Sequence, residues 1–126
     1  MKSLFALIVI FLFNLPSWTV AEAQSGLYKT NLEVAKYLYE KDVLSALLNK
    51  PQLSDGEKDA LLLAVYYKSS VQDLSLTEMR QVLAKYYSQD FSQERDSQVE
   101  ATFSKLMKQT DDLLMQKDFS YLTGQF

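Results

Sequence analysis

The side chains that most often perform catalysis or bind metals are missing from this sequence. It has no histidine and no cysteine. The usual ligands of zinc are therefore absent, as are the thiol nucleophile and any serine activated by a histidine. Catalysis would have to rely on carboxylates, lysines and hydroxyl groups alone. We therefore expect a protein that is not an enzyme and that carries no metal and no cofactor.

Acidic residues come close together in the sequence at two places. Asp111 and Asp112 are adjacent, but neighbours on a helix point about 100° apart and so cannot serve one site as acid and base. Residues 55–59 combine acidic residues with one glycine. They lack the alternating ligands over about twelve residues that a calcium loop requires. Both patterns are typical of a solvated helix surface or a helix start.

Tyrosine is the residue type that best fits a binding role. Six of the eight tyrosines lie near the ends of apolar helical segments. A tyrosine buries its ring and keeps its hydroxyl hydrated, so it suits the edge of a core, a protein interface or the lining of a ligand cavity. All three interpretations stay open from the sequence. The candidate partner-binding residues are Tyr37, Tyr39, Tyr66, Tyr67, Tyr86 and Tyr87.

Residues 1–23 have the pattern of a secretory signal peptide. Residues 4–13 form an unbroken apolar run after a basic start. Pro16 interrupts this run well short of the roughly 20 residues that a membrane-spanning helix needs. We expect cleavage, and an uncleaved membrane anchor is the alternative. The predicted cleavage site consists of Ala21, Ala23 and Gln24.

The remaining chain, residues 24–126, has the length of a single domain. Removing one lysine and one glutamate with the signal peptide leaves the net charge at −3. No basic run occurs, so we expect no nucleic-acid partner and, after cleavage, no stable membrane anchor. Small secreted domains without cysteine must rely on helix packing instead of disulfides. We therefore expect the bacterial periplasm, with secretion into the extracellular space as the alternative.

Helix start signals recur along residues 24–126. Three Ser/Thr-x-x-Glu patterns, beginning at Thr30, Ser54 and Ser75, match the capping box, in which a hydroxyl and a carboxylate satisfy free backbone amides. The apolar pattern over residues 31–49 changes phase at Lys41–Asp42. This change predicts two short helices, with Asp42 as the N-cap of the second.

Three longer helices are expected after residue 54. Residues 55–69 are apolar on every side in their middle, which predicts a central buried helix. Residues 76–88 and 93–116 each carry one apolar stripe, and residues 118–126 form an aromatic tail. The predicted fold is an all-α bundle of about five helices after a cleaved signal peptide, with two short N-terminal helices, one central buried helix and two longer amphipathic ones.

These observations favour an exported, non-catalytic protein-interaction module that binds one protein partner. Periplasmic adaptors, secretion-accessory proteins, chaperones and immunity-type proteins are all compatible with such a bundle. The alternative is a carrier that holds a hydrophobic small molecule in a cavity between helices. No motif in the sequence identifies the partner, the oligomeric state or the order of the helices in space.

Overall fold

The computed structural model describes residues 25–126, and every regular element in that part of the chain is helical. The predicted all-α bundle of about five helices is confirmed. The predicted signal peptide, with Ala21, Ala23 and Gln24, lies outside the described residues. The elements are a helix over residues 25–40, α2 (Val43–Leu48), α3 (Asp55–Val71), α4 (Leu76–Tyr87), α5 (Asp96–Gln116) and the 3-10 helix η1 (Ser120–Gly124).

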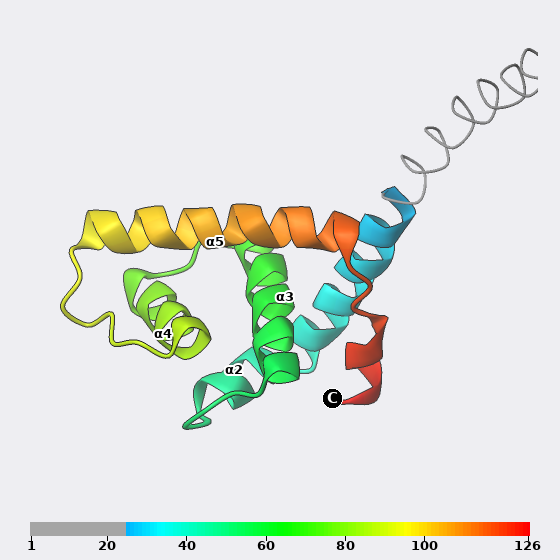
Figure 1. Cartoon of the computed structure of the whole chain (residues 1–126), viewed down its shortest axis with the longest axis horizontal. Helices are drawn as coiled ribbons and strands as arrows, with labels where there is room; N and C mark the ends of the chain where they lie inside the picture. The colour runs from blue at the N-terminus through cyan, green and yellow to red at the C-terminus, as the bar shows by residue number, and fades with distance from the viewer. Residues whose placement is uncertain (1–24) are drawn as a thin grey trace, which may run out of the picture.

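Helix α3 is the centre of the bundle, as its sequence predicts. Every residue from 60 to 65 is buried, with at most 1% of its surface exposed. This is possible because α3 contacts α2, α4 and α5 on different sides. In Figure 1, α5 runs across the top of the bundle, with helix 25–40 and the C-terminal segment at one end and α4 at the other.

The three predicted capping boxes have different outcomes. Ser54 forms a complete box, because its hydroxyl accepts from the Glu57 amide and Glu57 accepts from the Ser54 amide. Ser75 caps α4 with its hydroxyl, but the Glu78 carboxylate pairs with Lys68 instead of completing the box. The box at Thr30 is wrong, because helix 25–40 has already passed through its first turn at that residue.

The predicted break at Lys41–Asp42 is confirmed, and it depends on an unusual backbone conformation. Asp42 has φ 60° and ψ 33°, in the left-handed region, and lies between the end of helix 25–40 and the start of α2. Asp42 occupies the N-cap position, but its side chain caps no amide, so that part of the prediction is wrong. Side chains other than glycine adopt this conformation at a cost, and aspartate tolerates it better than most.

Helix α5 begins at Asp96, three residues later than predicted, because a side chain from α4 holds the preceding segment in another conformation. Arg80 donates from Nη1 to the carbonyl oxygens of Phe91 and Glu94, at 2.6 and 2.7 Å, and from Nη2 to the Asp96 carboxylate. These contacts fix the turn that leads into α5. Among the described residues, no helix is long and apolar enough to cross a membrane.

Candidate functional site

The six candidate tyrosines are distributed over four different settings. Tyr37 and Tyr66 are partly buried, and each is held by hydrogen bonds in a setting of its own. Tyr39 and Tyr67, from helix 25–40 and α3, lie against each other. Tyr86 and Tyr87 pair at the end of α4. The tertiary structure therefore pairs four of the six tyrosines and places Tyr37 and Tyr66 in hydrogen bonds with other groups.

Tyr66 takes part in a hydrogen-bond network that the sequence did not reveal. Its hydroxyl donates to the Asp111 carboxylate at 2.5 Å and lies 2.9 Å from the hydroxyl of Tyr28. Burial, followed by these two hydrogen bonds, raises the pKa of Tyr66 well above its usual value. The phenol therefore stays protonated and joins helix 25–40, α3 and α5. Asp112, the neighbour of Asp111, is exposed.

Asn31 is a fully buried polar side chain whose hydrogen bonds all go to the C-terminal part of the chain. Its amide donates to the carbonyl oxygens of Leu114 and Lys117, at 2.9 and 2.6 Å. Its own carbonyl oxygen accepts from the Phe119 amide at 2.9 Å. Asn31 thus satisfies two carbonyls near the end of α5 and starts the turn that follows.

The aromatic tail docks on the bundle through further contacts. Phe119 and Leu122 are completely buried. The Tyr37 hydroxyl donates to a Phe126 oxygen at 3.0 Å, and the Tyr121 hydroxyl donates to Asp59 at 2.5 Å. Burial, then the bond to Asp59, raises the pKa of Tyr121 to about 12. We call residues 117–126 the C-terminal latch. Asn31, Tyr37 and Asp59 hold it on the bundle.

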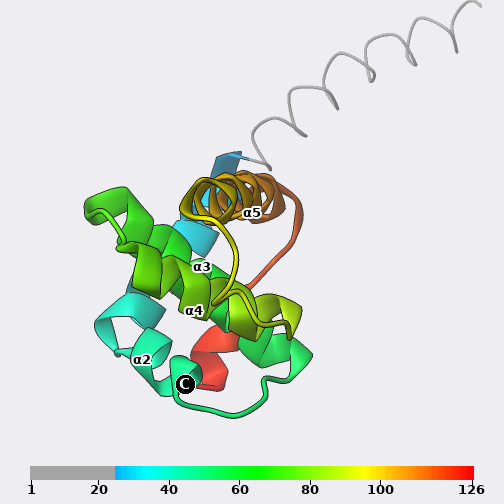
Figure 2. The same ribbon diagram turned by 90° about the vertical axis from the view of Figure 1, so that its left-hand side faces the viewer.

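A different arrangement exists where helix 25–40 and α3 end on the same side of the molecule, at the left of Figure 2. The rings of Tyr39 and Tyr67 pack with their centroids 5.3 Å apart and tilted by 46°. Gln72 donates to the Tyr39 hydroxyl at 3.0 Å. Val71, one helical turn beyond Tyr67, is 54% exposed and is the most exposed large hydrophobic residue described. We call Tyr39, Tyr67 and Val71 the tyrosine surface.

A hollow of about 410 Å³ adjoins the tyrosine surface and lies between helix 25–40, α2 and the ends of α3 and α4. Lys68 and Glu78 form an ion pair at its edge. Glu40 and Asp42 are both exposed and belong to none of the four ion pairs found among the described residues. The lining residues are Tyr39, Glu40, Asp42, Leu44, Ser45, Leu48, Lys68, Gln72 and Glu78.

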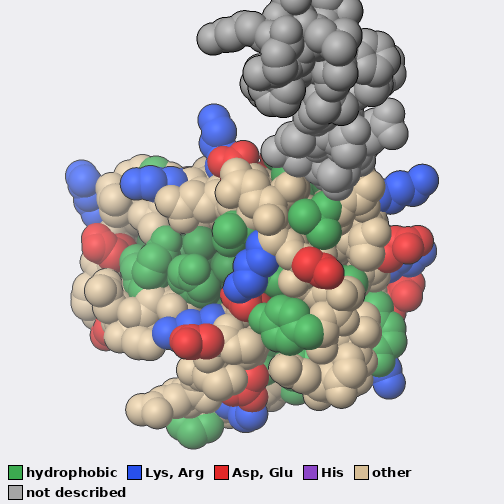
Figure 3. Space-filling model, turned by 45° about the vertical axis from the view of Figure 1, so that its right-hand side comes forward, with side chains coloured by type: hydrophobic (Ala, Val, Ile, Leu, Met, Phe, Trp, Pro, Cys, Tyr) green, Lys and Arg blue, Asp and Glu red, His purple; other side chains and the backbone are tan. Residues whose placement is uncertain are grey.

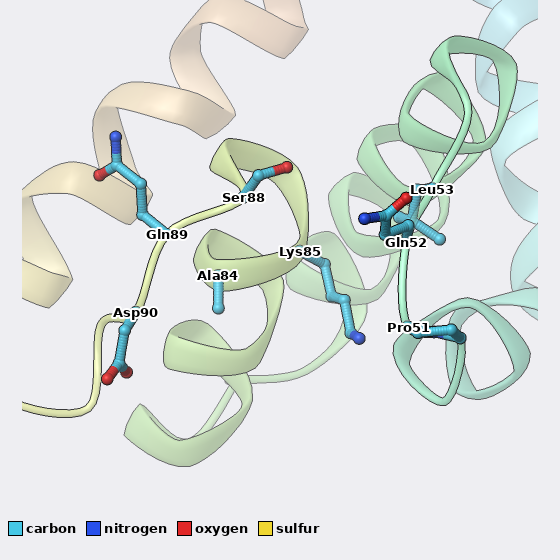
Figure 4. A pocket seen from close by; sticks show the side chains of 8 residues that line it. All are labelled: Pro51, Gln52, Leu53, Ala84, Lys85, Ser88, Gln89 and Asp90. Carbon is cyan, nitrogen blue, oxygen red and sulfur yellow. The ribbon is translucent and has the colours of Figure 1, made fainter.

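A second hollow, of about 640 Å³, lies between the segment 51–53 and α4. Figure 4 shows the Lys85 side chain extending from α4 toward Pro51, while Asp90 lies on the far side of α4. The Lys85 ammonium donates to the carbonyl oxygen of Lys50 and so bridges the two walls. The lysine in this hollow therefore serves the fold, and most of the lining is polar.

The third aromatic group lies at the end of α4. Tyr86 and Tyr87 pack edge to face at 5.0 Å between centroids, and Phe91 lies 6.1 Å from Tyr87. Tyr87 is 37% exposed. On the face seen in Figure 3, hydrophobic side chains gather in separate groups between charged ones, without one continuous apolar area. That face therefore offers several small apolar surfaces for contact.

Comparison with known proteins adds no assignment. No protein-family model matches this chain, and no match was found among curated proteins or solved structures. Within residues 25–126, no group of three or more acidic side chains is placed so that it could hold a metal ion. The surfaces of the bundle are therefore the features that can indicate a function.

Asn31 and Glu40 were not among the residues that the sequence singled out, and Asp42 was singled out only as a helix cap. A signal for Asn31 was present, because it lies three and seven positions before Val34 and Leu38 on the buried stripe of helix 25–40. A polar residue on an apolar stripe must find partners for its hydrogen bonds. Glu40 and Asp42 gave no such signal, because acidic residues at a helix end are common on solvated surfaces.

Proposed function

We propose that the exported chain acts as a non-catalytic protein-interaction module, placed in the bacterial periplasm by its signal peptide. It binds one protein partner through the tyrosine surface. The sequence supports export through its apolar run and cleavage motif, and the lack of cysteine favours the periplasm. The lack of histidine and cysteine argues against most catalytic chemistries.

The position of the Tyr39–Tyr67 pair is the observation that carries this proposal. The two rings are fixed against each other and by Gln72, next to the exposed Val71. Binding energy at protein interfaces concentrates on a few residues, among which tyrosine is one of the most frequent. Fixing the rings in advance also lowers the entropy that is lost on binding.

The geometry gives less support to a carrier of hydrophobic small molecules. Such a carrier needs an enclosed and mostly apolar cavity. The larger of the two hollows described above is about 640 Å³, and Gln52, Lys85 and Ser88 contribute polar groups to its lining. Buried leucines and Phe119 fill the core of the bundle among the described residues.

The proposal is tested by cross-linking in the cells that express the protein, followed by affinity capture and mass spectrometry. We expect one near-stoichiometric protein partner with the native chain. We expect Val71→Asp to lose that partner without a change in helicity by circular dichroism, because Val71 is 54% exposed and a charge there costs the fold little.

Tyr87→Ser provides the matched control, because it also removes an exposed hydrophobic residue, at 37% exposure, but far from the tyrosine surface in the chain. This variant should keep the partner. Loss of the partner with Tyr87→Ser and retention with Val71→Asp would move the binding surface to the end of α4. Capture of no protein at all, or of a small molecule alone, would contradict the interaction module.

A further inference from the structure

The hollow beside the tyrosine surface carries an uneven charge. Among its lining residues, Glu40, Asp42 and Glu78 are acidic and only Lys68 is basic. Lys68 is already paired with Glu78. Lys41, which lies between the two other acids in the sequence, holds its ammonium over the Tyr37 ring, 5.6 Å from the centroid, and is not part of the lining. The hollow therefore keeps two carboxylates, those of Glu40 and Asp42, that form no ion pair within residues 25–126.

The lining of the hollow also includes two leucines and an aromatic residue. Leu44 is buried and Leu48 is partly buried, and both line the hollow together with the ring of Tyr39. A lysine or arginine covers apolar surface with its aliphatic stem while its charged head reaches polar groups. An aromatic ring attracts the same cation through its electron-rich face. The apolar lining, the ring and the carboxylates thus favour the same type of side chain.

We infer that this hollow binds a lysine or arginine side chain from an extended basic segment of the protein partner. The inference rests on the proposed function, since the tyrosine surface would contact the same partner next to the hollow. Complementary charge at such a site increases specificity and the rate of association more than affinity. The effect must also weaken with added salt, because both carboxylates are exposed.

The test uses an NMR titration of the ¹⁵N-labelled protein as recovered from cells. The probe is a capped peptide that alternates arginine and leucine, and the comparison peptide has glutamate in place of arginine. We expect the arginine peptide to shift the amide signals of residues 39–48 and 68–78, and to do so less at high salt. The glutamate peptide should leave those signals unchanged.

Two neutral substitutions locate the effect. The double variant Glu40→Gln/Asp42→Asn keeps the size of both side chains and removes both charges. We expect it to bind the arginine peptide about three- to tenfold more weakly, as the loss of two partly exposed charge pairs implies. Glu100→Gln removes an exposed charge on α5 and should leave binding unchanged.

Three results would overturn the inference. The first is the absence of shifts in these two segments, and the second is equal binding by the double variant and the native protein. The third is an equal effect of spermidine, which would show that any organic cation binds and that no peptide is required. If cross-linking still captures a partner that Val71→Asp loses, the interaction module stands and only the basic segment is rejected. If no partner is captured, the proposed function itself fails.

Discussion

The two halves of helix 25–40 use their polar groups in opposite ways. In the first half, Asn31 is fully buried and each of its polar atoms is hydrogen-bonded to the C-terminal part of the chain. At the other end, Glu40 and the following Asp42 are exposed and without ion pairs among the described residues. The first region contributes to the stability of the fold, and the second is free to contact another molecule.

The contrast follows from the cost of burying polar groups. A buried polar group that lacks a hydrogen bond destabilises the fold. The buried amide of Asn31 therefore needs a partner for each of its polar atoms, and it has them. Among the described residues, no buried side-chain nitrogen or oxygen lacks a partner. An exposed carboxylate is hydrated and costs nothing when unpaired. A stable protein can therefore keep unpaired charge only at its surface, where it is available for binding.

The largest expected effect comes from Phe119→Ala in the C-terminal latch. Phe119 is completely buried, so its truncation should lower the free energy of unfolding by about 3 to 5 kcal/mol. Urea denaturation measures this change. Val71→Ala, in the tyrosine surface, is the comparison and should change the same quantity by less than about 0.5 kcal/mol. Equal losses of stability in the two variants would show that the latch contributes no more to the fold than the tyrosine surface does.

Asn31→Leu should have the next largest effect. It leaves the Leu114 and Lys117 carbonyls and the Phe119 amide without their partner, and we expect a loss of about 2 to 4 kcal/mol in unfolding free energy. Glu40→Gln, near the other end of the same helix, should change stability by less than about 0.5 kcal/mol. A loss below about 1 kcal/mol for Asn31→Leu would show that the latch contributes little.

Asp42→Gly should move stability and binding in opposite directions. Glycine adopts the left-handed conformation of residue 42 without strain, so the free energy of unfolding should rise by about 0.5 to 1 kcal/mol. The same change removes a carboxylate from the hollow and should therefore weaken binding of the arginine peptide. Ser88→Gly, at the other left-handed residue described, should also raise stability and leave peptide binding unchanged. A fall in stability for Asp42→Gly would mean that its side chain supports the turn.

The smallest expected effect is a loss of stability at alkaline pH, caused by ionisation of Tyr121 in the latch. The pKa of Tyr121 is raised to about 12 in the folded protein, above the value near 10 expected for an unfolded tyrosine. The neutral phenol thus adds stability that is fully present below about pH 10 and is lost as pH rises toward 12. Tyr121→Phe should remove that part of the pH dependence, as measured by denaturation at several pH values. An unchanged profile would show that the bond to Asp59 is not maintained in solution.

Most of the fold could be predicted from local patterns. The capping box at Ser54, the buried stripe of α5 and the change of phase at Lys41–Asp42 each depend on residues within a few positions of one another. The errors arose where distant residues compete with local signals. Arg80 delays the start of α5, and helix 25–40 includes Thr30 well inside its length.

The candidate site could be predicted only in part. The sequence singled out the tyrosines by type and by their place near helix ends. It could not show that Tyr39 and Tyr67 pack against each other while Tyr37 and Tyr66 form hydrogen bonds to other parts of the chain. All four follow similar apolar segments. The difference depends on which partner lies opposite each ring, and those partners are far away in the chain, from 33 positions between Tyr39 and Gln72 to 45 between Tyr66 and Asp111.

The sequence by itself determined the helical class, the central place of α3 and the shortage of catalytic side chains, because these depend on composition and on periodicity along the chain. Only the tertiary structure decided that the tail docks, that Asn31 holds it, and that Glu40 and Asp42 open onto a hollow lined by Tyr39. The physical reason is that burial and pairing are properties of surfaces in contact. Those surfaces exist only once helices far apart in the chain have packed together.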